Sequence, residues 1–308
     1  MTASALQKST IVRIKNSTLR STLRAADLVT PRIAGRMACN LWFRLPPPMA
    51  PTALPPGGEP FTVTAQGAAV RGHSFGDGDT TVYLVHGWGG LGSQLAAFVE
   101  PLVAAGHRVV LFDAPSHGDS DPGPSGPGRT HGVEIARALD AVFARFGPAE
   151  AVVAHSLGTV ATYVALRFGW LGTDRLVLVA PMVEALSLFD QFQAILGFGD
   201  RTRRAFDREV DRFVGLPIEE FDAIVQAGHV EPVPTLVVAD VGDRQTPYAD
   251  AERLVAALPD AELVTTEGLG HRRILRDPGV VARVVEFVSQ SGGARSTNAS
   301  PRRAQRTA

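Results

Sequence analysis

A serine, an acid and a histidine in this chain are spaced so that they could carry out nucleophilic chemistry. Ser156 ends a short apolar run in the stretch Ala151-Val-Val-Ala-His-Ser-Leu-Gly158, with a small residue two positions away on each side. This pattern is typical of a sharp turn from a strand into a helix, which presents a serine hydroxyl for attack. The alternative for Ser156 is an ordinary helix N-cap, a common place for serine.

A serine hydroxyl is a weak nucleophile until a histidine removes its proton, and a carboxylate must orient that histidine. His271 stands in the stretch Gly268-Leu-Gly-His271, between a strand-like run and the final helix-length segment. Two acids, Asp240 and Asp243, follow an earlier apolar run. The chain order Ser156, Asp243, His271 is expected when the three groups come from successive strand ends. Asp240 remains a rival for the role of the acid.

A glycine-rich loop could supply the backbone N–H groups that stabilise a negatively charged oxygen in such a site. The run His86-Gly-Trp-Gly-Gly90 directly follows another apolar segment. Its glycines let a backbone N–H, which we assign to Trp88, point at a reacting oxygen without a side chain in the way. Paired with the N–H of Leu157, it would form an oxyanion hole. The loss of one such donor typically lowers rates by about 10² to 10³-fold. The alternative is a plain glycine-rich turn.

The elements that must position these residues are predicted by the apolar pattern. Short continuous apolar runs, typical of strands covered on both faces, occur at 82–85, 109–112, 152–154, 176–179 and 236–238. Helix-length segments alternate with them at 93–105, 131–146, 156–168, 250–258 and 279–289. This alternation predicts an α/β fold with a mostly parallel, doubly wound sheet. Ahead of it, residues 61–64 and 68–71 flank a Gln66-Gly67 turn and predict a hairpin.

One segment, residues 182–231, breaks the alternation because it has no strand-like run. It carries six phenylalanines, Phe189, Phe192, Phe198, Phe206, Phe213 and Phe221. A helical insertion of this kind predicts a cap over the strand ends, where open α/β sheets bind ligands. The alternative is a structural excursion whose phenylalanines pack only on each other.

The segments flanking the predicted α/β domain (60–290) are basic. Residues 1–59 form an arm with apolar residues at helical spacing, arginines between them, an interruption expected at Pro31, and a proline-rich connector. Residues 1–50 carry a net +7 and residues 291–308 carry +4, which leaves −12 for the rest of a chain whose total is −1. The arm could dock on the body of the chain, our first choice, or on an anionic membrane. The tail, 291–308, is predicted to be disordered.

Length and composition further limit the class of protein and the compartment that we expect. A length of 308 residues suits one large domain with an insertion, and a single cysteine, Cys39, cannot form an internal disulfide. Charged residues break every apolar window at the N-terminus, and no run is long enough to span a bilayer. We therefore expect a cytoplasmic protein, with peripheral membrane attachment left open. We expect no metal, no cofactor and no nucleic-acid partner, since neither a dinucleotide fingerprint nor a P-loop lysine is present.

Over about residues 60–290 the chain resembles the α/β-hydrolase superfamily. The resemblance rests on the serine turn, on Gly242-Asp-Arg-Gln-Thr-Pro247 and on a loop, Asp113-Ala-Pro-Ser-His-Gly-Asp-Ser120, similar to the family's D-x-P-G-H-G-x-S. It implies Ser156 as nucleophile, Asp243 as acid, His271 as base, and Trp88 with Leu157 as the oxyanion hole. The chain departs from the family pattern at Ala154, at Ser116, where glycine is usual, and at Ala239-Asp240, where many members have His-Gly.

The function implied is that of a serine hydrolase of the carboxylesterase type. It would cleave carboxylic esters of small to medium apolar substrates through an acyl-enzyme, with thioesters, lactones and C–C bonds less favoured. A hypothesis of another class is a non-catalytic binding or membrane-adaptor protein that keeps the fold.

Overall fold

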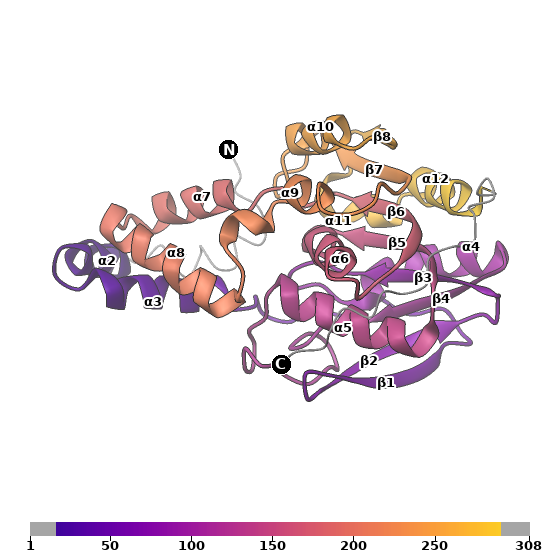
Figure 1. Cartoon of the computed structure of the whole chain (residues 1–308), viewed down its shortest axis with the longest axis horizontal. Coiled ribbons are helices and arrows are strands. Elements are labelled where there is room, and N and C mark those ends of the chain that lie inside the picture. Colours follow the sequence, from indigo (N-terminus) through magenta and orange to yellow (C-terminus); the bar gives the residue numbers. More distant parts are fainter. Residues whose placement is uncertain (1–16, 291–308) are drawn as a thin grey trace.

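The computed structural model describes residues 17–290; the first sixteen residues and the predicted disordered tail lie outside the described residues. Eight strands form one sheet in the order β1-β2-β4-β3-β5-β6-β7-β8 (Figure 1). The strands are β1 (Glu59–Ala65), β2 (Ala68–Phe75), β3 (Thr80–Val85), β4 (His107–Phe112), β5 (Ala149–His155), β6 (Thr173–Val179), β7 (Thr235–Asp240) and β8 (Ala261–Thr266). The predicted hairpin is β1 and β2, and β2 also runs antiparallel to β4. All pairs from β4 to β8 are parallel, which confirms the mostly parallel sheet.

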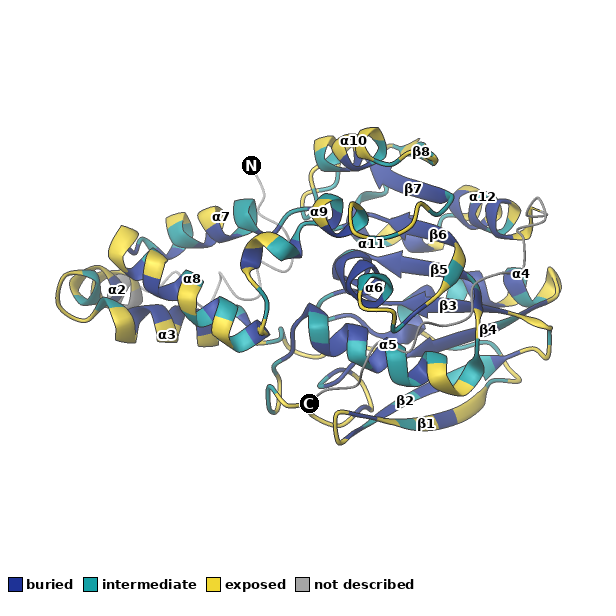
Figure 2. Cartoon of the chain, viewed as in Figure 1, coloured by how far each residue is buried: buried dark blue, intermediate teal, exposed yellow. Residues whose placement is uncertain are grey.

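Helices cover both faces of the sheet, and the central strands β3 to β7 are mostly buried, whereas the edge strands β1 and β8 are partly exposed (Figure 2). One face packs against α5 (Gly132–Phe146), α6 (Leu157–Arg167) and α10 (Tyr248–Ala257). The other packs against the 3-10 helix η1 (Gly92–Phe98), α4 (Val99–Ala104), η3 (Ile274–Arg276) and α12 (Pro278–Ser289). Successive residues of a strand point to opposite faces, so Tyr83 lies in the first of these clusters and Leu84 in the second.

The segment predicted as one helix over 93–105 is divided into η1 and α4. Pro101 lies in the first turn of α4 and has no N–H to donate. In a continuous α-helix its ring would also collide with the carbonyl group of residue 97, so the helix has to begin again close to the proline.

The strand order places the chemically interesting loops together. β3 lies at the centre, and the chain passes from it to β4 on one side and then to β5 on the other. Such a reversal leaves a crevice at the carboxyl ends of the two strands that part there. The loop that follows β3 and the serine turn that follows β5 meet at this crevice.

Between β6 and β7 the chain forms helices only, α7 (Leu186–Leu196), α8 (Asp200–Val214), η2 (Ile218–Phe221) and α9 (Ala223–Ala227). The N-terminal arm forms α2 (Ser17–Val29) and α3 (Pro31–Trp42). Pro31 separates the two as expected, and it is the first residue of α3, where a missing N–H does no harm. None of the helices within residues 17–290 is both long and apolar enough to cross a membrane.

The arm docks on the chain itself: α3 packs along α8, while α2 contacts both α7 and α8. Figure 1 shows these four helices as one lobe beside the sheet, and we call them the helical lobe. Contact between α3 and α8 is close, since a Cβ atom added at Gly35 would lie 2.6 Å from Ala205 Cβ and from the Phe206 nitrogen. Asp27 of α2 accepts a hydrogen bond of 2.8 Å from the Thr202 N–H near the start of α8. The lobe is thus held by close packing and by a helix-end hydrogen bond.

We predict that Gly35→Ala destabilises the protein by about 1–3 kcal/mol, because the added methyl group has no room against the backbone of α8. Alanine favours a helix interior over glycine by about 0.5–1 kcal/mol, so propensity alone predicts the opposite sign. Chemical denaturation measures the difference, with Asn40→Ala on the exposed side of α3 as the matched control. A gain in stability for Gly35→Ala would contradict the close helix contact.

Candidate active site

Ser156 occupies a strained turn between β5 and α6. Its backbone lies at φ 55° and ψ −121°, a region that is unfavourable for any residue with a side chain. The Ser156 N–H donates to the Val179 carbonyl oxygen (3.2 Å), and the Ser156 carbonyl oxygen accepts from the N–H groups of Thr159 (3.0 Å) and Met182 (3.1 Å). These hydrogen bonds hold the serine at the mouth of the crevice.

Small neighbours make this turn possible. A Cβ atom on Gly158 would lie 2.7 Å from the Val85 carbonyl oxygen, and one on Gly87 would lie 2.7 Å from Ser156 Cβ. Ala154, which stands where the family pattern has glycine, is fully buried in β5, and the turn is formed with its methyl group in place. This departure from the pattern therefore leaves the geometry of the serine intact.

The structure brings His271 and Asp243 together in a buried pair. His271 lies on the short helix α11 (Gly270–Arg273), and its Nδ1 is 2.7 Å from Asp243 Oδ2. Burial raises the pKa of Asp243, but hydrogen bonds from His271, Gln245 and Thr246 outweigh it, so the net pKa lies below the usual value. An ionised carboxylate can only accept, so His271 Nδ1 is the donor in this pair.

Asp240 has a different set of partners. Its Oδ2 accepts from the Leu269 N–H (2.8 Å) and the Thr266 hydroxyl (2.9 Å), and its Oδ1 accepts from the Gly242 N–H (2.9 Å). These bonds tie the end of β7 to the loop that precedes His271. Asp243, rather than Asp240, is therefore the carboxylate that contacts the histidine.

Ser156, Asp243 and the two residues of the expected oxyanion hole, Trp88 and Leu157, line one cavity of about 360 Å³. Among residues 17–290, no hydrogen bond joins Ser156 to His271, whose side chain is 5% exposed. Hydrogen bonds of this kind are often long in a free enzyme and tighten when substrate is bound.

The loop after β3 lies directly against the start of α6. A Cβ atom at Gly87 would be 3.3 Å from the Leu157 nitrogen. Leu157 is the first residue of α6, and the first N–H groups of a helix have no partner within the helix. The helix dipole also favours negative charge at this position. The arrangement offers N–H donors to an anionic oxygen near Ser156.

Two buried histidines hold this loop in shape. His86 Nε2 accepts from the Ala114 N–H (2.9 Å), so its Nδ1 carries the proton and donates to the Gly87 carbonyl oxygen (2.8 Å). His117 Nε2 likewise accepts from the Gly89 N–H (3.1 Å). Burial lowers the pKa of His86 to about 4 and that of His117 to about 3, so both imidazoles are neutral near pH 7.

Sequence reasoning missed two residues that position the histidine. His155, which the sequence places next to Ser156, has its Nε2 3.0 Å from the His271 carbonyl oxygen and ties the serine strand to α11. Thr246 was not singled out, although its hydroxyl lies 3.0 Å from Asp243 Oδ2 and 3.4 Å from His271 Nδ1. A hydroxyl three residues after an aspartate in a loop is the signal that could have found it, because short side chains there bond locally.

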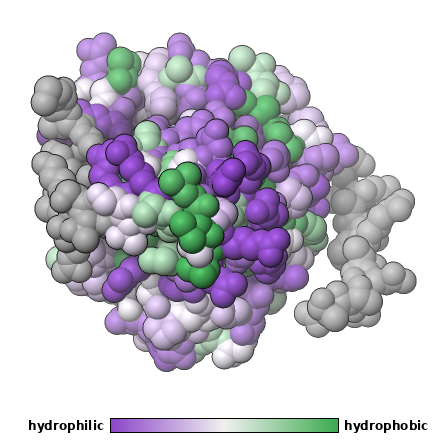
Figure 3. Space-filling model, turned by 90° about the vertical axis from the view of Figure 1, so that its left-hand side faces the viewer, coloured by the Kyte–Doolittle hydropathy of each residue, from purple (hydrophilic) through white to green (hydrophobic). Residues whose placement is uncertain are grey.

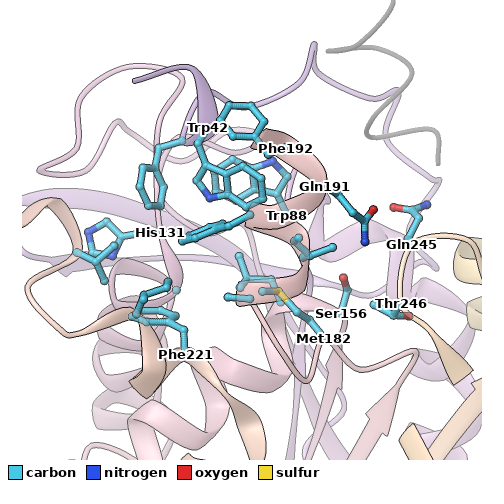
Figure 4. Close-up of a pocket in the computed structure, with 18 of the residues that line it drawn as sticks. Trp42, Trp88, His131, Ser156, Met182, Gln191, Phe192, Phe221, Gln245 and Thr246 are labelled. Carbon is cyan, nitrogen blue, oxygen red and sulfur yellow. The ribbon is translucent and has the colours of Figure 1, made fainter. Parts of the chain in front are cut away.

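The walls of the cavity are mainly apolar and come from three parts of the chain. Figure 4 shows Trp42, Phe192 and Phe221 on one side of Ser156, with Gln245 and Thr246 on the other. Three of the six predicted cap phenylalanines line the cavity, namely Phe189, Phe192 and Phe221. The other three, Phe198, Phe206 and Phe213, contact aromatic rings of the lobe or of Phe43.

The arm also contributes to the cavity, which the sequence did not indicate. Trp42, at the end of α3, packs edge-on against Phe189 and Phe192, with ring centroids 4.8 and 5.0 Å apart. Leu41, Phe43 and Arg44 line the cavity beside it. Within residues 17–290, no group of three or more His, Cys, Asp or Glu side chains is arranged to hold a metal ion.

The structure contains an open α/β sheet with a strained serine turn beside the point where the strand order reverses. A histidine–carboxylate pair lies at the same edge of that sheet. The sequence pattern of the alpha/beta hydrolase family matches residues 82–284. The chain therefore belongs to the alpha/beta hydrolase family.

Known relatives differ in what they are named for. The chain is 27% identical over 242 residues to 2-hydroxy-6-oxononadienedioate/2-hydroxy-6-oxononatrienedioate hydrolase 2 of Pseudomonas putida, which covers 65% of this chain and 84% of that protein. It is 54% identical to hydrolase 1 of the same name from Dechloromonas aromatica, but over 50 residues, 15% of this chain and 17% of that protein. Among solved structures, an esterase of Pyrococcus furiosus has a TM-score of 0.61 at 17% identity, covering 82% of this chain and 99% of that one. At that identity the likeness shows the fold alone.

We predict that the protein loses stability in mild acid. Burial lowers the pKa of His86 to about 4 and the pKa values of His117 and His155 to about 3, from an ordinary 6.5. The unfolded chain takes up these protons below pH ~6.5 and the folded chain does not, so this contribution is full above ~6.5 and falls as the pH drops. The free energy of unfolding should decrease by up to about 4 kcal/mol per pH unit below pH ~6, at ~1.4 kcal/mol for each histidine.

Urea denaturation at pH 7.5, 6 and 5 measures this dependence. His117→Gln removes one of the three protons, so it should reduce the slope by about a third. His229→Gln, at an exposed position, should leave the slope unchanged. A flat stability profile from pH 7.5 to 5 would show that these histidines are not held neutral.

Proposed function

We propose that the chain is a serine hydrolase that cleaves carboxylic esters with apolar acyl groups. The observation that carries the proposal is that the strained Ser156 turn and Asp243, the carboxylate that binds His271, line the same mainly apolar cavity. A serine turn alone is found in many proteins, but an imidazole oriented by a buried carboxylate at the same edge of the sheet can supply its base.

The reaction follows from these positions. Ser156 Oγ attacks the ester carbonyl carbon while its proton passes to His271 Nε2, and Asp243 stabilises the imidazolium that forms. The N–H groups of Trp88 and Leu157 hold the negative oxygen of the tetrahedral intermediate. His271 then returns the proton to the leaving alcohol, which gives an acyl-enzyme. Water repeats the sequence and releases the carboxylic acid with Ser156 restored.

The cavity favours an apolar acyl group on one side of the serine. Trp42, Phe192 and Phe221 provide an apolar wall there, whereas Gln245 and Thr246 on the other side suit a more polar leaving group (Figure 4). A cavity of about 360 Å³ lies at the small end of the usual range for ligand sites, which supports small to medium substrates.

The names of the relatives favour a second candidate, hydrolysis of a C–C bond. A 2-hydroxy-6-oxononadienedioate contains no ester, so its hydrolysis must break a carbon–carbon bond, and it carries two carboxylates. The arginines that line the cavity here, Arg44 and Arg244, are both exposed. The cavity thus offers an apolar interior rather than a buried cation for a dianion, and we prefer the ester.

We predict that a fluorophosphonate adds once to the purified protein and that Ser156→Ala and His271→Ala abolish the adduct. Both variants should lower turnover of p-nitrophenyl esters by about 10⁴-fold or more, because the residues act as a unit. Intact mass and steady-state kinetics measure the two effects. Parallel assays with a 2-hydroxy-6-oxo-2,4-dienoate, followed by its absorbance, compare C–C with ester hydrolysis.

The two acids provide a matched comparison. Asp243→Asn should lower kcat by about 10⁴-fold, since it leaves the imidazole without its charged partner. Asp240→Asn should lower stability by about 1–3 kcal/mol while turnover falls less than tenfold. If the dienoate is hydrolysed far faster than any ester, the second candidate is correct. If the folded wild type neither labels nor turns over either substrate class, the chain is a binding or adaptor protein.

We also predict that Trp42→Ala shifts the preferred acyl length towards longer chains, because it removes the indole that closes the cavity. The change should lower kcat/KM for a short ester by about tenfold and spare longer ones. A series of p-nitrophenyl esters measures the profile, with Met37→Ala as a control outside the cavity on the same helix. An unchanged profile would mean that α3 takes no part in the acyl site. Deleting the whole arm is a poorer test, since it also uncovers α8.

A further inference from the structure

An exposed apolar patch lies at the outer corner of the α2–α3 hairpin. Four of the seven large apolar side chains that are exposed among residues 17–290 lie within residues 28–37. They are Leu28 (72% exposed), Val29 (80%), Ile33 (58%) and Met37 (48%), and we call them the tip patch. Figure 3 views this end of the molecule and shows hydrophobic side chains gathered on a face that is otherwise largely hydrophilic. A cluster of exposed apolar side chains on a surface of this kind is typical of a site that binds a protein or a membrane.

Helix packing does not require these residues. α3 uses Ala34, Gly35, Ala38 and Cys39 to contact its neighbours, and all four are buried. Ile33 and Met37 are one turn apart on a different side of the same helix, and Leu28 and Val29 end α2. The hairpin therefore has one apolar face that packs on the lobe and a second that faces outward.

The charges around the tip patch are positive. Arg32 and Arg36 immediately precede Ile33 and Met37, both are exposed, and neither belongs to an ion pair among the described residues. The one acid on the two helices, Asp27, is turned to the N–H of Thr202. The helices α2, α3, α7 and α8 together hold nine arginines and six acids, a net +3, in a chain whose total is −1.

We propose that the tip patch docks the protein on an anionic lipid bilayer. Apolar side chains at a helix corner enter the boundary between headgroups and acyl chains, while the surrounding arginines meet lipid phosphates. Arginine stems can lie along the apolar surface and keep their charged ends at the headgroups. This positive rim is the reason to choose an anionic bilayer over a symmetric lobe-to-lobe contact with a second copy of the chain, in which two +3 lobes would repel each other.

The docking surface and the cavity share a helix. Ile33 precedes Trp42 by nine residues, which is about 13 Å along α3 at 1.5 Å per residue. Docking at the tip patch would thus hold the cavity close to the membrane surface. The inference goes beyond the ester hydrolysis proposed above, and its test does not depend on turnover.

Sedimentation of the full chain with vesicles tests the proposal. Wild-type protein should bind vesicles of phosphatidylcholine with 30% phosphatidylglycerol and should bind pure phosphatidylcholine at least tenfold more weakly. Replacing Leu28, Val29, Ile33 and Met37 together by serine should weaken binding to the anionic vesicles by at least tenfold. Arg32→Gln with Arg36→Gln should weaken it by about tenfold and flatten its dependence on salt.

Phe168→Ser removes an exposed apolar side chain elsewhere and should bind like the wild type. Circular dichroism and thermal unfolding confirm that each variant is folded. Equal binding by wild type and the four-serine variant, or no binding by wild type, would overturn the proposal. So would sedimentation velocity showing a wild-type dimer that the four-serine variant loses, without vesicle binding, because the patch would then join two copies.

Discussion

The backbone of Ser156 can stay at φ 55° and ψ −121° only because its surroundings leave it no other conformation. Val179, at the end of β6, accepts from its N–H, and Met182, beyond β6, donates to its carbonyl oxygen. Gly87, beyond β3, packs on its Cβ. These contacts come from the ends of β6 and β3, which flank β5 in the sheet, so the serine turn depends on the register of these three strands. The same register brings the glycine loop to the first N–H of α6.

A second constraint is the close packing of segments that are far apart in sequence. The arm and the insertion between β6 and β7 are separated by the first half of the α/β domain, yet α3 and α8 approach until only glycine fits at position 35. This contact brings Trp42 to Phe189 and Phe192 and completes the apolar wall of the cavity. The lobe therefore links the stability of the arm to the shape of the site.

The sheet was predictable from the sequence because buried parallel strands are short apolar runs, and the order of Ser156, Asp243 and His271 follows from the strand order. The choice between Asp240 and Asp243 was not, since Asp240 ends β7, Asp243 follows three residues later, and only the path of the loop decides which carboxylate contacts the histidine. The role of Trp42 in the cavity could not be predicted for another reason. The apolar spacing in α3 shows that one side of the helix packs, but not which segment of the chain it packs against. The bond of His155 to the His271 carbonyl oxygen could not be predicted either, because it joins segments that are 116 residues apart in the sequence.

The most direct test of this account is a diffraction structure of the protein after reaction with a medium-chain alkyl fluorophosphonate. The account predicts phosphorus bonded to Ser156 Oγ, with one phosphonyl oxygen about 2.7–3.1 Å from the backbone nitrogens of Leu157 and Trp88. The alkyl chain should lie between Trp42 and Phe192. Phosphorus on another residue, or an oxygen turned away from both N–H groups, would contradict the assignment of the site. An alkyl chain directed into solvent would contradict the role of the helical lobe.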